Sequence, residues 1–155
     1  MSGAVLIGIG NSYRRDDGVG PAVAESIAAQ GYPGLRVYSG VAEPTAILDA
    51  WNGATLAVVI DATVGMPPGR VQTARLDDLS EPVAVSSHDL SLRQTWELGR
   101  ALDSAPDQVV VVTVGVADVG HGMGLSPAVS AALPEAVRAV LAAVEAAEES
   151  GDQQP

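Results

Sequence analysis

Four side chains lie at points of the sequence where catalytic or metal-binding groups are often placed. Asp16 and Asp17 follow the first apolar segment and a glycine-containing loop, and Asp61 ends a second apolar segment. His88 comes just before a predicted helix. Two carboxylates and an imidazole suit a first-row transition metal such as nickel or zinc, so Asp17, Asp61 and His88 are candidate metal ligands. The chain has no cysteine, so such a site would lack thiolates and would exchange its metal readily.

Each of these candidates also has an ordinary structural explanation. Asp17 could simply cap the helix that follows it, because a carboxylate is favoured at a helix N-terminus. Asp61 could stabilise a turn, and His88 could be a structural histidine with satisfied hydrogen bonds. In open α/β sheets, however, ligands bind outside the carboxyl ends of the strands, and all three residues are expected at that edge. Their common placement favours a functional site.

Apolar segments alternate with amphipathic ones, and this alternation predicts the elements that position the candidates. Strands are expected over residues 4–9, 35–39, 56–60, 71–76 and 109–114, and helices over 18–30, 43–53, 90–102 and from 127 onward. The segments 56–60 and 109–114 are apolar throughout, which is typical of strands covered on both faces. No helix separates 71–76 from 56–60, so this strand is expected to run antiparallel at an edge.

This pattern predicts a single α/β domain with a five-stranded, mostly parallel sheet covered by helices on both faces. The domain is expected to span residues 1–150, followed by a disordered tail over 151–155. Pro134 is expected to kink or divide the last helix, because proline lacks the N–H that an interior helical position needs.

Composition excludes several classes of function. The 155 residues carry 8 basic and 19 acidic side chains, a net charge of −11, which argues against nucleic acid or an anionic membrane as a partner. Without cysteine there are no disulfides and no cysteine nucleophile. The first residues lack a basic leader and a cleavage site, and no run reaches the length of an apolar membrane span. We therefore expect a cytoplasmic protein without membrane insertion.

The glycine-containing first loop is also a partial match to a dinucleotide-binding motif. Gly8 and Gly10 supply the first two glycines, but Tyr13 stands where the third is required. The acids in this loop would also repel a pyrophosphate. The dinucleotide interpretation is therefore disfavoured.

The second histidine, His121, lies in a glycine-rich loop, 115–124, at the same predicted edge of the sheet. It is a candidate substrate contact and a weaker candidate ligand than His88. No serine triad is indicated, because Ser86 and Ser87 adjoin His88 in sequence and the chain has no G-x-S-x-G elbow.

Four blocks of the sequence, taken in order, resemble the hydrogenase maturation proteases, endopeptidases that process the large subunit of nickel–iron hydrogenases. The blocks are Gly8–Asn11 with Asp16–Gly20, Val59–Ala62, Ser87–Leu92, and Gly115–Val116 with Gly124–Pro127. The first and last blocks together are specific to the family. The resemblance covers nearly the whole chain up to about Val144.

This resemblance implies an α/β/α sandwich of the phosphorylase/hydrolase-like type. It also implies removal of a short C-terminal extension from the precursor of a [NiFe]-hydrogenase large subunit, after nickel has been inserted. The metal contacts of the family fall on Asp17, Asp61 and His88. Nickel would arrive with the substrate, so no organic cofactor is expected and the isolated enzyme need not hold metal.

The general base and two arginines are less well defined by the resemblance. A carboxylate such as Asp16 is a candidate general base in peptide hydrolysis. Arg14 and Arg15 precede the acidic pair where relatives usually have small, polar or acidic residues. These arginines could pair with Asp16 or contact an acidic segment of the precursor.

Two alternatives from other functional classes stay open. One is a nickel-binding accessory module without protease activity. The other is a small-molecule hydrolase on a similar sheet, although a nucleoside site would favour more than the 3% of aromatic residues found here.

Overall fold

The computed structural model describes residues 3–41, 43–78 and 92–152, and within them one sheet forms the centre of the molecule. Its strands are β1 (Ala4–Ile9), β2 (Leu35–Val41), β3 (Leu56–Thr63), β4 (Val71–Arg75) and β5 (Gln108–Gly115). The spatial order of the five strands is β2-β1-β3-β5-β4. All neighbouring pairs are parallel except β4 and β5. The predicted mostly parallel sheet with an antiparallel edge strand is therefore confirmed.

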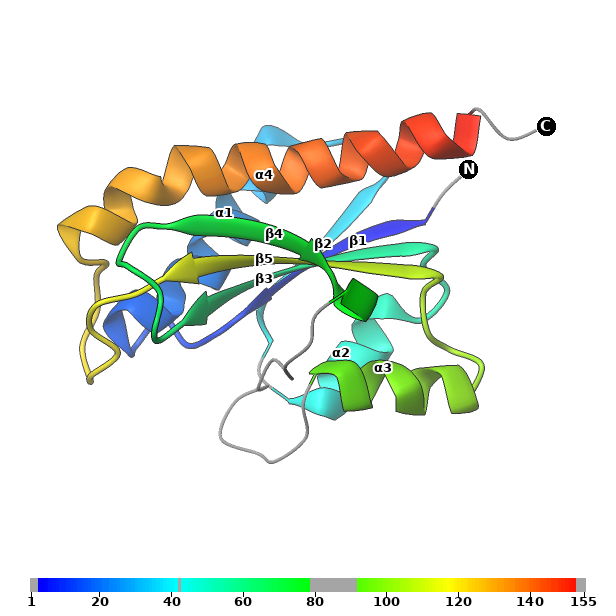
Figure 1. The fold of residues 1–155 in the computed structure, drawn as a ribbon, viewed down its shortest axis with the longest axis horizontal. Helices are drawn as coiled ribbons and strands as arrows, with labels where there is room; N and C mark the ends of the chain where they lie inside the picture. The colour runs from blue at the N-terminus through cyan, green and yellow to red at the C-terminus, as the bar shows by residue number, and fades with distance from the viewer. Residues whose placement is uncertain (1–2, 42, 79–91, 153–155) are drawn as a thin grey trace.

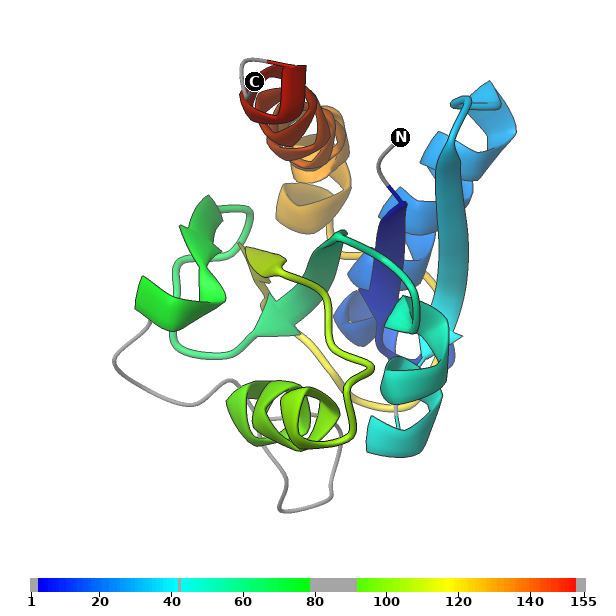
Figure 2. The ribbon, with the colours of Figure 1, turned by 90° about the vertical axis from the view of Figure 1, so that its right-hand side faces the viewer.

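Helices cover both faces of the sheet (Figures 1 and 2). They are α1 (Val19–Gln30), α2 (Pro44–Trp51), α3 (Leu92–Ala101) and α4 (Pro127–Asp152), with short 3-10 turns η1 (Arg15–Gly18) and η2 (Leu76–Asp78). The helices α1 and α4 pack with one set of strand side chains, and α2 and α3 pack with the other set. This confirms the α/β/α arrangement.

Alternation along the central strands explains why these strands are apolar throughout. In β1, Leu6 faces the α1 and α4 layer, whereas Val5 and Ile7 face the α2 and α3 layer. The same division separates Val58 from Val59 in β3. Because successive side chains of a strand point to opposite faces, a sheet covered on both sides needs apolar residues at every position.

The first turn of α1 lies directly against the carboxyl ends of two strands. A Cβ atom on Gly20 would collide with the carbonyl oxygen of Ile9 and would lie 2.7 Å from that of Ile60. A glycine at this position therefore permits the close approach. The approach fixes the preceding turn η1, which carries Asp16 and Asp17, at the edge of the sheet where β1 and β3 end.

The end of β3 and the course of α4 differ from the sequence predictions. The strand β3 continues to Thr63, because Asp61, Ala62 and Thr63 still pair with β5. Asp61 therefore lies inside a strand and does not belong to a turn. The helix α4 is one helix that contains Pro134, so the expected division does not occur, and it extends through residues 151 and 152 of the predicted disordered tail. Residues 153–155 of that tail lie outside the described part of the chain.

Among the described residues, one helix is long and apolar enough to cross a membrane by length and composition, so the expectation that no run reaches that length is wrong. This stretch is Pro127–Ala147 in α4. Its inner face packs into the core of the domain, where Val129, Ala136 and Val140 are fully buried. A core helix that is rich in alanine passes the same test, so the packing identifies α4 as part of the fold.

Candidate functional site

Two of the predicted site residues, Asp17 and Asp61, lie at the carboxyl ends of adjacent strands. Asp17 is in η1, which follows β1, and Asp61 is near the end of β3, the parallel neighbour of β1. The side chain of Asp17 is half-buried, and its Oδ2 accepts a 2.9 Å hydrogen bond from the Asn11 N–H. The charge of Asp17 raises the pKa of Asp61, in agreement with the position of the two acids at neighbouring strand ends.

Asp61 is a buried acid with few contacts that offset the cost of burying its charge. It is 7% exposed, and within the described residues its carboxylate accepts one hydrogen bond, of 2.8 Å, from the Ala62 N–H to Oδ1. Burial raises the pKa of Asp61 well above its ordinary value, the hydrogen bond from Ala62 lowers it in part, and the charge of Asp17 raises it further. A cation between the two carboxyl groups would relieve both the burial cost and the repulsion.

This environment predicts that Asp61→Asn stabilises the fold at neutral pH, by about 1–2 kcal/mol. Asparagine has nearly the same shape and can still accept the hydrogen bond from Ala62, but it carries no charge. Because the pKa of Asp61 is raised in the folded state, the burial cost is absent below the unfolded pKa of about 4 and grows as pH rises through the folded pKa. Urea unfolding at a series of pH values measures the difference.

The control for this prediction is Asp107→Asn, which changes an exposed acid at the other end of the sheet, just before β5. That variant is expected to have the same unfolding free energy as the wild type to within about 0.5 kcal/mol. A stability gain by Asp61→Asn that is equal at pH 4 and pH 8, or no gain at either pH, would contradict the burial argument.

Asp16 performs a task that the sequence analysis did not predict. It is fully buried, and its carboxylate accepts four hydrogen bonds from residues more than 100 positions away. Oδ2 accepts from the Ala117 N–H at 2.9 Å, the Asp118 N–H at 3.0 Å and the Ser126 hydroxyl at 2.8 Å. Oδ1 accepts from the Ser126 N–H at 2.6 Å. Asp16 thus fastens η1 to the segment 117–126 that leads into α4.

These contacts also set the acidity of Asp16. Burial by itself raises the pKa of this carboxyl, but the hydrogen bonds from Ser126, Ala117 and Asp118 outweigh the burial and lower the pKa below its ordinary value. A general base is more effective with a raised pKa and an oxygen free to face the substrate. The arrangement therefore favours a structural role for Asp16 over the general-base role considered from the sequence.

Arg14 and Arg15 contact the same segment, so the first of their two suggested roles, pairing with Asp16, is not observed. Arg14 Nε donates to the Val119 carbonyl at 3.1 Å. Arg15 Nε donates to the His121 carbonyl at 3.2 Å and lies 3.6 Å from the carboxylate of Asp118. Among the described residues, every hydrogen-bond donor to the Asp16 carboxylate lies in the 117–126 segment, and the two arginines hold the outer part of that loop.

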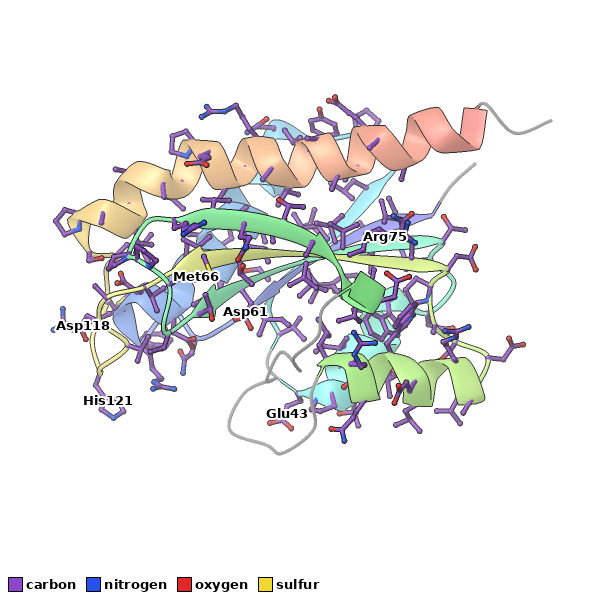
Figure 3. The ribbon with its side chains drawn as sticks, viewed as in Figure 1. Glu43, Asp61, Met66, Arg75, Asp118 and His121 are labelled. Carbon is purple, nitrogen blue, oxygen red and sulfur yellow. The ribbon has the colours of Figure 1, made fainter. Side chains whose placement is uncertain are left out.

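The two histidines have different outcomes. His88 lies outside the described residues, so its role as a ligand stays a prediction. His121 is exposed at the tip of the loop after β5, pointing away from the sheet, as Figure 3 shows relative to Asp61 and Asp118. In the part of the chain that the structure describes, no group of three or more histidine and acidic side chains is close enough to hold a metal ion. The structure thus does not bring His121 to the acid pair.

Two site residues escaped sequence reasoning in whole or in part. A serine just before Pro127 is typical of a helix cap, yet the Ser126 hydroxyl donates to Asp16, while its carbonyl accepts a hydrogen bond from the Ser130 N–H at 2.8 Å. Asn11 accepts a hydrogen bond from the Tyr13 N–H and donates one to Asp17. An asparagine at a turn signals local hydrogen bonding, but only the fold shows that Asp17 is the acceptor.

Comparison with known proteins decides the family. A profile of the hydrogenase maturation protease family matches residues 21–143 of the chain. The chain belongs to this family. The match includes Asp61 and the position of His88 and begins just after Asp17.

Among curated hydrogenase maturation proteases, the hydrogenase 3 maturation protease of Escherichia coli K12 is 33% identical over 91 residues, which cover 57% of this chain. The match spans 58% of the length of that relative. Another similar protein is Protein FrxA of Pyrococcus furiosus, which is 26% identical over 140 residues, 83% of this chain and 96% of that protein.

Solved structures of family members share the fold. The hydrogenase maturating endopeptidase HybD of Escherichia coli superposes with a TM-score of 0.80 over 93% of both chains, at 22% identity. The [NiFe] hydrogenase maturation protease HycI of Thermococcus kodakarensis superposes with a TM-score of 0.66 over 92% of this chain and 90% of that chain, at 26% identity. The α/β/α sandwich is thus the fold of known hydrogenase maturation proteases.

Proposed function

We propose that this protein is an endopeptidase that removes a C-terminal extension from the nickel-loaded precursor of a [NiFe]-hydrogenase large subunit. Membership of the hydrogenase maturation protease family supports the reaction class and the kind of substrate. We propose further that the enzyme acts in the cytoplasm on the precursor and requires no organic cofactor.

The observation that carries this proposal is the burial of Asp61 at the end of β3, beside the end of β1 that Asp17 follows. A fold rarely retains a buried acid beside a second acid unless the pair has a task, because both burial and repulsion oppose ionisation of Asp61. Carboxylates, together with an imidazole, suit a borderline divalent metal such as nickel. The site is therefore fitted to contact a cation that another molecule brings.

In the proposed reaction the nickel is part of the substrate, held by the precursor. Asp17 and Asp61 contact it from the ends of β1 and β3, and His88 is proposed as the third contact. This docking brings the scissile peptide bond to the carboxyl edge of the sheet. A metal ion beside a peptide can polarise its carbonyl or acidify a bound water. A precursor without nickel would lack the bridge to these residues and would not be cut.

The test compares nickel-loaded and nickel-free forms of the same precursor. Each form is incubated with purified protein, and mass spectrometry measures the mass of the large subunit. We expect loss of a short C-terminal peptide from the loaded form only. Asp107→Asn, the exposed acid at the opposite end of the sheet, serves as the control variant and should cut at the wild-type rate.

Other outcomes would lead to other functions. Cleavage of both forms at equal rates would retain the protease and remove nickel as the recognition element. No cleavage of either form by folded protein, together with stoichiometric nickel binding, would favour the nickel-binding accessory module.

A further inference from the structure

Three large apolar side chains are exposed at the edge of the sheet that carries Asp17 and Asp61. Tyr13 follows β1 and is 68% exposed, Val64 follows β3 and is 77% exposed, and Met123 follows β5 and is 69% exposed. We call these three residues the apolar rim. Single exposed apolar residues are normal on a protein surface, but their gathering around a site indicates an interaction surface.

The loops that carry Tyr13 and Met123 are held together by backbone hydrogen bonds. The Gly122 N–H donates to the Tyr13 carbonyl at 2.8 Å, and the Arg15 N–H donates to the Gly122 carbonyl at 2.9 Å. Tyr13 and Met123 therefore lie on adjacent backbone segments, although they are 110 positions apart in sequence. A surface that is already ordered loses little conformational entropy when a partner binds.

The apolar rim is also connected to the acid pair by hydrogen bonds. The Tyr13 N–H donates to Asn11 Oδ1 at 2.9 Å, and the Asn11 N–H donates to Asp17 Oδ2 at 2.9 Å. A substrate segment that binds against Tyr13 would thus lie close to Asp17. This proximity suits a segment that flanks a bond cut at the acid pair.

The positive charge of Arg14 beside the apolar rim indicates that the bound segment carries a negative charge. Arg14 adjoins Tyr13, is exposed, and uses its Nε to bind the Val119 carbonyl. Within the described residues it forms no ion pair, in a chain whose net charge is −11. The terminal nitrogens of Arg14 can therefore bind a carboxylate of a partner. The acidic residues elsewhere on the surface would repel such a carboxylate.

We propose that the apolar rim docks an apolar segment of the hydrogenase precursor next to the scissile bond, with a carboxylate of that segment placed at Arg14. This inference rests on the proposed function for the identity of the partner. It adds a specificity determinant that is separate from the metal contacts.

The test uses the double variant Tyr13→Ser with Met123→Ser. The matched control is Leu98→Ser with Leu102→Ser, which removes two exposed leucines from α3 and the turn after it. With nickel-loaded precursor we expect the rim variant to raise KM about tenfold or more and to leave kcat within about twofold, because the rim acts in binding. The α3 control should match the wild type, and the melting temperatures of all three proteins should agree.

In Arg14→Gln, KM should depend less on salt than in the wild type.

A binding measurement separates this inference from the proposed function. Nickel-free precursor, which the proposed function leaves uncut, is titrated against the same proteins by biolayer interferometry. Weaker binding by the rim variant alone supports docking, even if the wild type cuts no precursor and the proposed function fails. Equal KM and equal binding by the rim variant and the wild type, an equal loss in the α3 control, or no binding by any protein would overturn the proposal.

Discussion

We expect Asp17→Asn to reduce cleavage of the nickel-loaded precursor by about a hundredfold or more, with little change in stability. Asparagine keeps the size of the side chain and can still accept the 2.9 Å hydrogen bond from Asn11, but it has no negative charge to offer a cation. Within the described residues, the hydrogen bond from Asn11 is the only one that the Asp17 side chain makes. The loss should therefore appear in the rate and leave the fold intact, as measured by precursor mass spectrometry and by thermal unfolding.

Two comparisons sharpen this result. His88→Ala is expected to lose cleavage in the same way, since family resemblance assigns His88 to the same metal. Asp107→Asn removes an equal charge from an exposed position and should leave the rate unchanged. Normal cleavage by a folded Asp17→Asn protein would exclude the proposed contact between Asp17 and the substrate's nickel.

Local patterns in the sequence were sufficient to predict the sheet and the edge at which the acids meet. The apolar segments 4–9 and 109–114 fall within β1 and β5 because strands covered on both faces leave a continuous apolar signal. The position of β4 followed from the missing helix between it and β3. Once the strand directions were known, Asp17 and Asp61 had to lie at one edge.

Long-range contacts could not be predicted in this way. Asp16 and Asp17 are identical neighbours in sequence, yet Asp16 is fully buried under the 117–126 segment, whereas Asp17 is half-buried and belongs to the acid pair. Only the path of the loop after β5 separates their roles. The tolerance of α4 for Pro134 also depends on the folded environment. Pro134 cannot donate to the Ser130 carbonyl, but Ser130 is exposed, so this carbonyl can bind water.

The contrast between the two adjacent aspartates leads to the largest expected effect on stability. Asp16→Asn should lower the free energy of unfolding by about 2–4 kcal/mol. The asparagine amide would place its own N–H groups against N–H donors that now bind a carboxylate, so at least one buried donor at Ser126 or Ala117 would lose its acceptor. For a domain of this size the melting temperature should fall by roughly 5–15 °C. The neighbouring Asp17→Asn is the matched control and should lose much less.

The pH dependence distinguishes the lost carboxylate from a general packing defect. The hydrogen bonds from Ser126, Ala117 and Asp118 hold the folded pKa of Asp16 below its ordinary value, against the effect of burial. The stability that Asp16 contributes is therefore fully present above the unfolded pKa of about 4 and is lost as pH falls through the lower folded pKa. The gap in unfolding free energy between wild type and Asp16→Asn should be constant from pH 6 to pH 8 and should shrink in stronger acid, whereas a packing defect would leave the gap unchanged.

Asp61→Asn should show the opposite sign, with a stability gain that grows as pH rises, because burial raises the pKa of Asp61. Opposite pH trends in these two variants would show that one buried acid stabilises the edge of the sheet while the other is retained there at a cost in stability.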